Sequence, residues 1–253
     1  MTRAFLLLPL AALVSGCYSS GYSSGPCYPG YLNVYWTPGP SPNAGFEVPG
    51  LVAAGFPAEL GCAAAGVTGV QVFVGGQIAP CSGGGGFCVD ANTWVCGTGG
   101  VSVAITAGGT YSVQVDAYDS QGNLKYTSGP VAASASDCGD SAVGVFSQGV
   151  DGTLGIDYAF TDLAACQAGS QITWDLRSGL ATPFDGGSIV CGGTNPFLVN
   201  GGAAVPAGVY TLVNVAEVVG TTSFHAYCNA TPVVHAGPES LLVDMAPSTG
   251  TCF

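Results

Sequence analysis

The chain has 253 residues, with 15 acidic residues against 3 basic ones and a formal net charge of −12 at pH 7. Such a surface repels phosphate groups, so we expect neither a nucleic-acid partner nor direct electrostatic docking to anionic lipid. After residue 16 no run of 18 consecutive apolar residues occurs, which argues against a membrane-spanning helix, and the many aliphatic and aromatic residues argue against disorder.

Residues 1–16 have the layout of a secretory signal peptide. One positive charge, on Arg3, precedes an apolar run at 4–14 that is shorter than the roughly 20 residues a spanning helix needs. The run ends in Leu-Val-Ser-Gly-Cys at 13–17, which resembles the bacterial lipoprotein signal of an aliphatic residue, two small residues and a cysteine. The resemblance implies a diacylglycerol thioether on Cys17 and acylation of the new N-terminus, for example by palmitate. The alternative is an ordinary signal peptide whose Cys17 forms a disulfide.

The residue after the expected lipidation site bears on localisation. It is Tyr18, whereas Asp at this position in Gram-negative lipoproteins implies retention in the inner membrane. We therefore expect a cell-envelope protein anchored in the outer membrane, either periplasmic or surface-exposed. The mature chain keeps two basic residues, Lys125 and Arg177, against fifteen acids, a formal side-chain charge of −13. The membrane contact must accordingly come from several acyl chains rather than from charge.

The cysteine count supports the anchor independently. Of eleven cysteines, ten remain once Cys17 carries lipid, an even number suited to five disulfides in an oxidising compartment. A zinc site is not indicated, because the chain has no Cys-x2-Cys pair and only two histidines, His225 and His235. We expect no cofactor.

The mature chain divides into a tether and two diverged copies of one unit. Residues 17–30 are rich in Ser, Gly and Tyr and predict a flexible tether, followed by domains at 31–138 and 139–253. Three sequence blocks recur in the same order in both domains. The matching blocks are 62–74 with 166–176, 94–97 with 189–192, and 107–115 with 207–212.

Most of these blocks alternate apolar with polar residues, which predicts half-buried β-strands. Asp119 to Asn123 between two such runs is a hairpin-turn signal. Short strands separated by Gly-rich turns favour an all-β fold of two tandem β-sandwich domains stabilised by disulfides. The alternating segments are 70–74, 101–105, 111–117, 154–160, 172–176, 210–212, 224–228 and 241–245.

Two of the blocks resemble known families. Gly-Thr-Tyr-Ser-Val-Gln-Val at 109–115 and Gly-Val-Tyr-Thr-Leu at 208–212 are similar to a strand of prealbumin-like, carboxypeptidase regulatory-like and related immunoglobulin-like domains. Cys-Ala-Ala-Ala-Gly-Val at 62–67 resembles tandem repeats of myxobacterial lipoproteins. The resemblance covers about 40 residues of each copy, and it implies a sandwich with a non-catalytic accessory or binding role.

Spacing alone leaves the disulfide connectivity open. The repeat favours two equivalent bridges, one in each copy, and places Cys81 and Cys88 around a Gly-rich insertion. The remaining cysteines would then tie down the C-terminus and the tether. The expected pairs are Cys62–Cys96, Cys166–Cys191, Cys81–Cys88, Cys228–Cys252 and Cys27–Cys138.

No sequence motif identifies a catalytic centre, and we expect no enzyme. We interpret His225 as a surface residue of a strand, and His235 has no evident partner nearby in sequence. A hydrolase that uses paired carboxylates stays open as an alternative, because fifteen acids offer many pairs. Asp116, Asp119 and Asn123 are candidate calcium ligands, but they do not have EF-hand spacing, and service of the hairpin turn is the favoured interpretation.

The aromatic residues bear on the choice between structural and binding roles. Trp94 and Trp174 share strand faces with apolar residues, so we expect both in cores, with Trp94 against a disulfide. The three aromatics nearest the tether are less constrained and are candidates for a contact patch with an envelope protein or a glycan. They are Tyr31, Tyr35 and Trp36.

The expected function is therefore a structural or binding role at the cell envelope, with an adhesion or glycan-binding module as the alternative. One further expectation concerns charge. Asp175 and Arg177 point to the same side of a predicted strand and should pair with each other or with Asp157.

Overall fold

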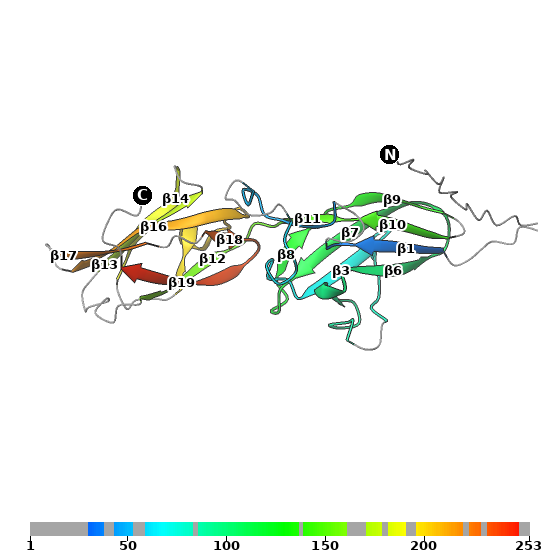
Figure 1. The fold of residues 1–253 in the computed structure, drawn as a ribbon, viewed down its shortest axis with the longest axis horizontal. Helices are drawn as coiled ribbons and strands as arrows, with labels where there is room; N and C mark the ends of the chain where they lie inside the picture. Colours follow the sequence, from blue (N-terminus) through cyan, green and yellow to red (C-terminus); the bar gives the residue numbers. More distant parts are fainter. Residues whose placement is uncertain are drawn as a thin grey trace, which may run out of the picture.

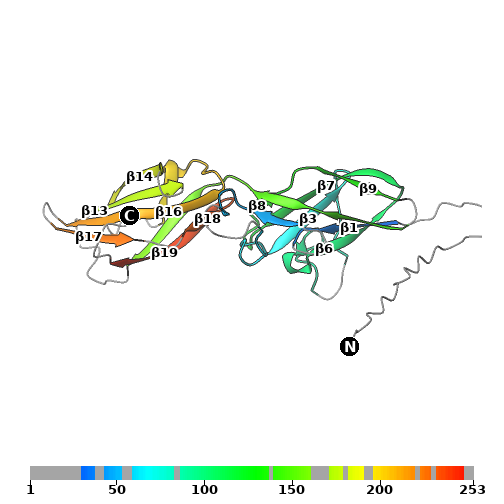
Figure 2. The same ribbon diagram turned by 45° about the horizontal axis from the view of Figure 1, so that its top comes forward.

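The computed structural model shows two β-sandwiches placed end to end, and the turned view shows the same arrangement (Figures 1 and 2). It describes residues 30–37, 43–52, 59–82, 86–136, 139–160, 171–178, 182–190, 196–219, 223–228 and 232–247. Within these ranges only two short 3-10 turns interrupt the strands, η1 (Cys96–Thr98) and η2 (Val199–Gly202). The predicted all-β fold of two tandem sandwiches is confirmed. None of the described helical segments has the length and hydrophobicity to cross a bilayer.

The first sandwich packs a three-stranded sheet against a larger one. In the small sheet β1 (Gly30–Tyr35) lies between β10 (Asp140–Gly144), which runs parallel to it, and β6 (Gly100–Ile105), which runs antiparallel. The larger sheet has the order β2-β11-β8-β7-β3-β4, with β5 paired to β3 and β9 to β7. Its strands are β2 (Gly45–Glu47), β3 (Gly69–Val74), β4 (Gln77–Ile78), β5 (Trp94–Val95), β7 (Gly109–Tyr118), β8 (Leu124–Thr127), β9 (Val131–Ala135) and β11 (Phe146–Gly149).

The second sandwich is one continuous sheet that closes over its own core. The strand order is β14-β13-β16-β17-β19-β12-β15, with β18 paired to β16. Alternate residues of β12 and β13 point inward, so Leu154, Ile156 and Leu176 are fully buried. The strands are β12 (Leu154–Phe160), β13 (Gln171–Ser178), β14 (Thr182–Val190), β15 (Phe197–Leu198), β16 (Gly208–Val219), β17 (Ser223–Cys228), β18 (Val233–His235) and β19 (Glu239–Pro247).

The three repeated sequence blocks occupy matching places in the two sandwiches. In the first sandwich β3 pairs antiparallel with β7 on one side and β5 on the other. In the second, β13 pairs antiparallel with β16 and β14. Each sandwich also pairs an early strand parallel with a late one, β1 with β10 and β12 with β19. The recurrence in sequence therefore corresponds to a recurrence in topology.

The strand pairing differs from the expected division of the chain at residues 138 and 139. Both β10 and β11 follow that division, yet they pair with β1 and β2. The pairing therefore places 140–149 in the sheets of the first sandwich. The connection from the first sandwich to the second comes later in the chain, between β11 and β12.

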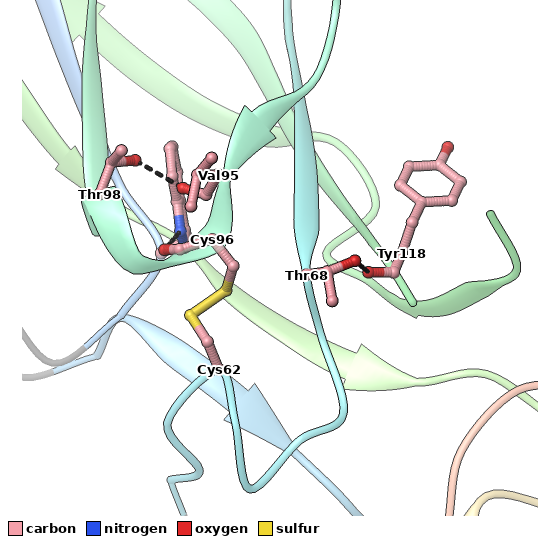
Figure 3. The surroundings of a disulfide bond; sticks show 7 residues. Cys62, Thr68, Val95, Cys96, Thr98 and Tyr118 are labelled. Carbon is pink, nitrogen blue, oxygen red and sulfur yellow. Dashed lines mark hydrogen bonds between the residues drawn. A yellow bond between two sulfur atoms is a disulfide. The ribbon is translucent and has the colours of Figure 1, made fainter. Parts of the chain in front are cut away.

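Two disulfides tie down the first sandwich. Cys62 and Cys96 are bonded, with their Cα atoms 5.9 Å apart (Figure 3). Cys81 is bonded to Cys88. The backbone oxygen of Cys96 also accepts a hydrogen bond of 2.9 Å from Trp36 Nε1, so this bridge contacts the end of β1. The other three expected bridges, Cys27–Cys138, Cys166–Cys191 and Cys228–Cys252, and the expected lipidation site Cys17, involve residues or side chains outside the described part.

Candidate functional site: the joint between the two sandwiches

The segment 150–153, which links β11 to β12, is hydrogen-bonded at every residue. Val150 N donates to Lys125 O at 3.0 Å, and Val150 O accepts from Gly237 N at 2.6 Å. Gly152 exchanges two hydrogen bonds with Val205, at 3.0 and 2.7 Å. Further bonds run from Ala207 N to Asp151 Oδ1 (2.9 Å) and from Glu239 N to Thr153 O (2.9 Å). These four residues are therefore a structured connection, in contrast to a flexible linker whose backbone is solvated.

Two glycines allow the backbones of the joint to approach closely. A Cβ added to Gly152 would lie 2.1 Å from Gly237 C, a separation that no side chain tolerates. Gly237 has φ +65° and faces β8, where an added Cβ would lie 2.3 Å from Leu124 O. Only glycine fits both the left-handed conformation and the contact. The turn between β18 and β19 is thus packed between β8 of the first sandwich and the linking segment.

Three ionisable side chains from both sandwiches meet at this joint. Lys125 Nζ on β8 lies 2.6 Å from Glu239 Oε2 on β19, and the other carboxylate oxygen, Oε1, lies 2.7 Å from His235 Nδ1 on β18. The His235 side chain is fully buried, and those of Lys125 and Glu239 are only 6% and 15% exposed. Lys125 is the only lysine of the chain. A single carboxylate therefore contacts both Lys125 and His235 at the joint.

Both ring nitrogens of His235 lie within hydrogen-bond distance of partners at the joint. Nε2 is 3.2 Å from Gly152 O and 3.1 Å from Val205 O, and because carbonyl oxygens only accept, Nε2 carries a hydrogen. On the other side of the ring, Nδ1 lies 2.7 Å from Glu239 Oε1. The ring thus links the carboxylate to two backbone carbonyls, one in the linking segment and one before β16.

Apolar and aromatic residues enclose this network. Val209 and Val234 belong to strands of the second sandwich but pack against the core of the first, which includes Ala236. The Tyr210 ring lies 6.2 Å from the His235 ring. Burial, and after it the Glu239 carboxylate, raises the pKa of Tyr126. The joint is therefore built like the interior of one domain, with a packed apolar layer and satisfied polar groups.

The sequence did not reveal this network. His235 has no evident partner in the sequence, because its contact with Glu239 forms across a tight turn of the folded chain. Lys125 is 114 positions from Glu239. One signal in the composition points toward the network. The chain has a single lysine and fifteen acidic residues, so an ion pair between Lys125 and one of the carboxylates can be expected. His225 lies on β17, and its side chain is outside the described part.

The candidate calcium ligands serve the protein's own hydrogen bonds. Asp119 accepts hydrogen bonds from Gln121 N, Asn123 N and Asn123 Nδ2 at 2.8 to 3.0 Å, which closes the predicted hairpin turn. Burial acts to raise the pKa of Asp119, but these hydrogen bonds and the charge of Lys125 outweigh it and lower the pKa. Asp116 is bound by Gln114 and Thr127. Among the described residues no cluster of His, Cys, Asp and Glu has the arrangement of a metal site.

The aromatic predictions had mixed outcomes. Trp174 is in the core as predicted, and Trp94 is partly buried against the first core. The prediction of an accessible Trp36 is wrong, because its indole is fully buried and hydrogen-bonds Cys96, whereas Tyr31 is 41% exposed. The expected pair of Asp175 and Arg177 is confirmed, with Arg177 Nη2 2.9 Å from Asp175 Oδ2.

No protein-family model and no curated protein sequence matches the chain. Among solved structures it is similar to a leucine-rich repeat protein from Bacteroides thetaiotaomicron (10% identity, TM-score 0.26, 86% of this chain and 26% of that one). It is also similar to the Bacillus anthracis TIE protein (11% identity, TM-score 0.26, 87% of this chain and 34% of that one). A third similar structure is GBS52, a minor pilin of Streptococcus agalactiae (12% identity, TM-score 0.24, 87% of this chain and 97% of that one). The chain thus spans about a quarter and a third of the first two proteins. With TM-scores below 0.5, we transfer no residue and no role from them.

Proposed function

We propose that the protein is a non-catalytic, lipid-anchored component of the cell envelope, in which two sandwiches form a rigid spacer with a structural or binding role. The observation that carries the proposal is the buried contact of Lys125 with Glu239 and His235 across the joint. An enclosed ion network adds little net stability, but it strongly penalises any arrangement that separates its members. It therefore favours one relative orientation of the two sandwiches.

The direction of the chain supports the same role. β1 runs parallel to β10, and Tyr31 near the start of β1 pairs with Asp140 at the start of β10. The two strands therefore begin at the same end of the first sandwich. From there β10 leads through β11 to the joint. An anchor on Cys17 would consequently hold the first sandwich by the end that faces away from the second. The second sandwich would stand farther from the membrane.

The anchor is tested by changing Cys17→Ala in the producing bacterium and fractionating the envelope. The protein with Cys17 intact should partition with membranes and the variant with the soluble envelope fraction, because a mature chain with a formal side-chain charge of −13 has no other strong attraction to lipid. Cys27→Ala is the matched control, since it removes a nearby cysteine and leaves the signal intact. Retention of the Cys17→Ala protein in membranes, or release of the control, would contradict the proposal.

A further inference from the structure

The outward face of the three-stranded sheet carries a row of polar aromatic residues. Along β1, Leu32 and Val34 point into the core, so Tyr31, Asn33 and Tyr35 point outward. The two flanking strands present only small residues beside them, apart from one carboxylate. These are Ala104, Ser102 and Gly100 on β6, and Asp140, Ala142 and Gly144 on β10. Figure 1 shows the three strands side by side on the first sandwich.

Beside these small neighbours Tyr31 is 41% exposed, and Tyr35 is half-buried. A Cβ on Gly100 would lie 2.6 Å from Tyr35 Cδ1 and 3.1 Å from its Cε1, so the ring covers the place where a side chain would stand. On the flanking strands, Ala104 beside Tyr31 and Ala142 beside Asn33 are exposed. The flanking strands therefore leave the Tyr31 ring exposed and the Tyr35 ring partly exposed.

Between the two tyrosines stands an amide with donors to spare. Asn33 Oδ1 accepts a hydrogen bond of 2.5 Å from Ser102 Oγ, which fixes the amide, and its Nδ2 group has no partner among the residues that the structure describes. Tyr31 and Tyr35 are four residues apart on one strand, about 13 Å. The face thus alternates apolar ring, hydrogen-bond donor and apolar ring along a straight line.

We infer that this face binds a neutral glycan chain. A pyranose ring has an apolar C–H face and a rim of hydroxyl groups, which matches stacking on tyrosine rings with hydrogen bonds to Asn33 and Ser102. An anionic glycan or a phosphorylated ligand does not fit, because the face holds one carboxylate, Asp140, and no cation. The face thus favours a ligand that needs no counter-charge.

The size of the face separates a glycan from a protein partner. Five residues along β1 and three strands across give about 13 by 10 Å, or roughly 130 Å². A stable protein interface buries about 800 Å² on each partner, several times more than this platform provides. A linear saccharide requires only a narrow strip with stacking positions. This inference concerns a different surface from the joint and does not depend on the lipid anchor.

The test is a binding titration of the detergent-solubilised full-length protein with neutral hexasaccharides of glucose and of N-acetylglucosamine. At least one should bind, and Tyr31→Ala and Tyr35→Ala should each weaken the binding about tenfold or more, which is ~1.4 kcal/mol. Tyr31→Phe should bind nearly as well as the unmodified protein, because the ring remains. Phe87→Ala, at another exposed aromatic, is the matched control and should change nothing.

A second variant covers the case in which a tyrosine substitution disturbs folding. Ala142→Trp adds bulk to an exposed position beside Asn33 and should block binding without removing any group from the platform. Absence of binding to every neutral hexasaccharide would overturn the inference. Tighter binding of a sulfated hexasaccharide than of the neutral ones would also overturn it, as would an equal loss of binding in Phe87→Ala. A partner protein whose capture is abolished by Tyr31→Ala, with no sugar bound, would overturn it as well.

Discussion

Lys125 Nζ lies 2.6 Å from Glu239 Oε2, although 114 residues separate them and each belongs to a different sandwich. The contact is enclosed, and its carboxylate is shared with a fully buried histidine. A buried ion network adds little net stability, but removal of one member is strongly destabilising because it leaves an uncompensated charge. The mechanical coupling of the two sandwiches is therefore open to direct measurement.

Removal of one charge at the joint should be costly. Lys125→Met leaves Glu239 Oε2 enclosed without its cation, and we expect a loss of about 3–5 kcal/mol in the free energy of unfolding. Urea unfolding followed by tryptophan fluorescence measures this, since Trp36 and Trp174 report on the first and second cores. The double variant Lys125→Met with Glu239→Leu should recover part of the loss, because no uncompensated carboxylate remains.

The control for this prediction is the other described Lys or Arg ion pair. Arg177→Met breaks the contact between Arg177 and Asp175, whose side chains are 21% and 22% exposed. Because solvent screens this pair more than the pair at the joint, we expect a loss of about 1 kcal/mol. Equal losses in Lys125→Met and Arg177→Met would show that the joint is no more tightly coupled than an ordinary surface contact.

Gly152→Ala should loosen the joint while leaving each sandwich folded. Its Cβ would collide with the Gly237–Pro238 backbone at 2.1 to 2.3 Å, so the turn between β18 and β19 must move away from the linking segment. Small-angle X-ray scattering should then report a wider range of end-to-end distances. Gly61→Ala is the control, because its Cβ would meet nothing within 4 Å. Identical scattering from the Gly152→Ala and unmodified proteins would contradict a rigid joint.

Stability should decline at alkaline pH partly through Tyr126. Burial and the nearby Glu239 raise the pKa of this tyrosine, so the fold favours its neutral form. The stabilising contribution is fully present below the ordinary tyrosine pKa of about 10, and it is lost as pH rises beyond that toward the folded pKa. In Tyr126→Phe the free energy of unfolding should fall less steeply with pH, by up to ~1.4 kcal/mol per pH unit, because phenylalanine does not titrate. Urea unfolding between pH 9 and pH 12 should show it, and the exposed-site variant Tyr31→Phe should not.

The two described disulfides should differ in their contribution to stability. Cys62–Cys96 closes a loop with a sequence separation of 34, and Cys81–Cys88 one of 7. Loop-closure entropy then predicts losses of about 4 and about 2 kcal/mol when each pair is replaced by alanine. Chemical denaturation of the two double variants gives the comparison. A reversed order would indicate that packing around the short loop matters more than chain entropy.

Local pattern was sufficient to predict the strands, the hairpin turn and the two-copy architecture. Alternation at period two depends only on which face of a strand meets the core, so β3, β7, β12 and β19 are visible in the sequence. The Asp119 turn is visible for the same reason, because its hydrogen bonds reach only Gln121 and Asn123. The pairing of β10 with β1 is not visible in this way, because a parallel partner distant in the chain leaves no local pattern.

The lipoprotein-like signal, the all-β class and the acidic, cysteine-rich character can be recognised without a structure. These follow from short motifs and from counts. The folded arrangement of the strands is needed to see that Trp36 is buried, that Tyr31 and Tyr35 lie on one sheet face with Asn33, and that Lys125, His235 and Glu239 meet. The physical reason is that these relationships join strands distant in the chain, and their register is set by packing of the whole sheet rather than by any neighbouring residue.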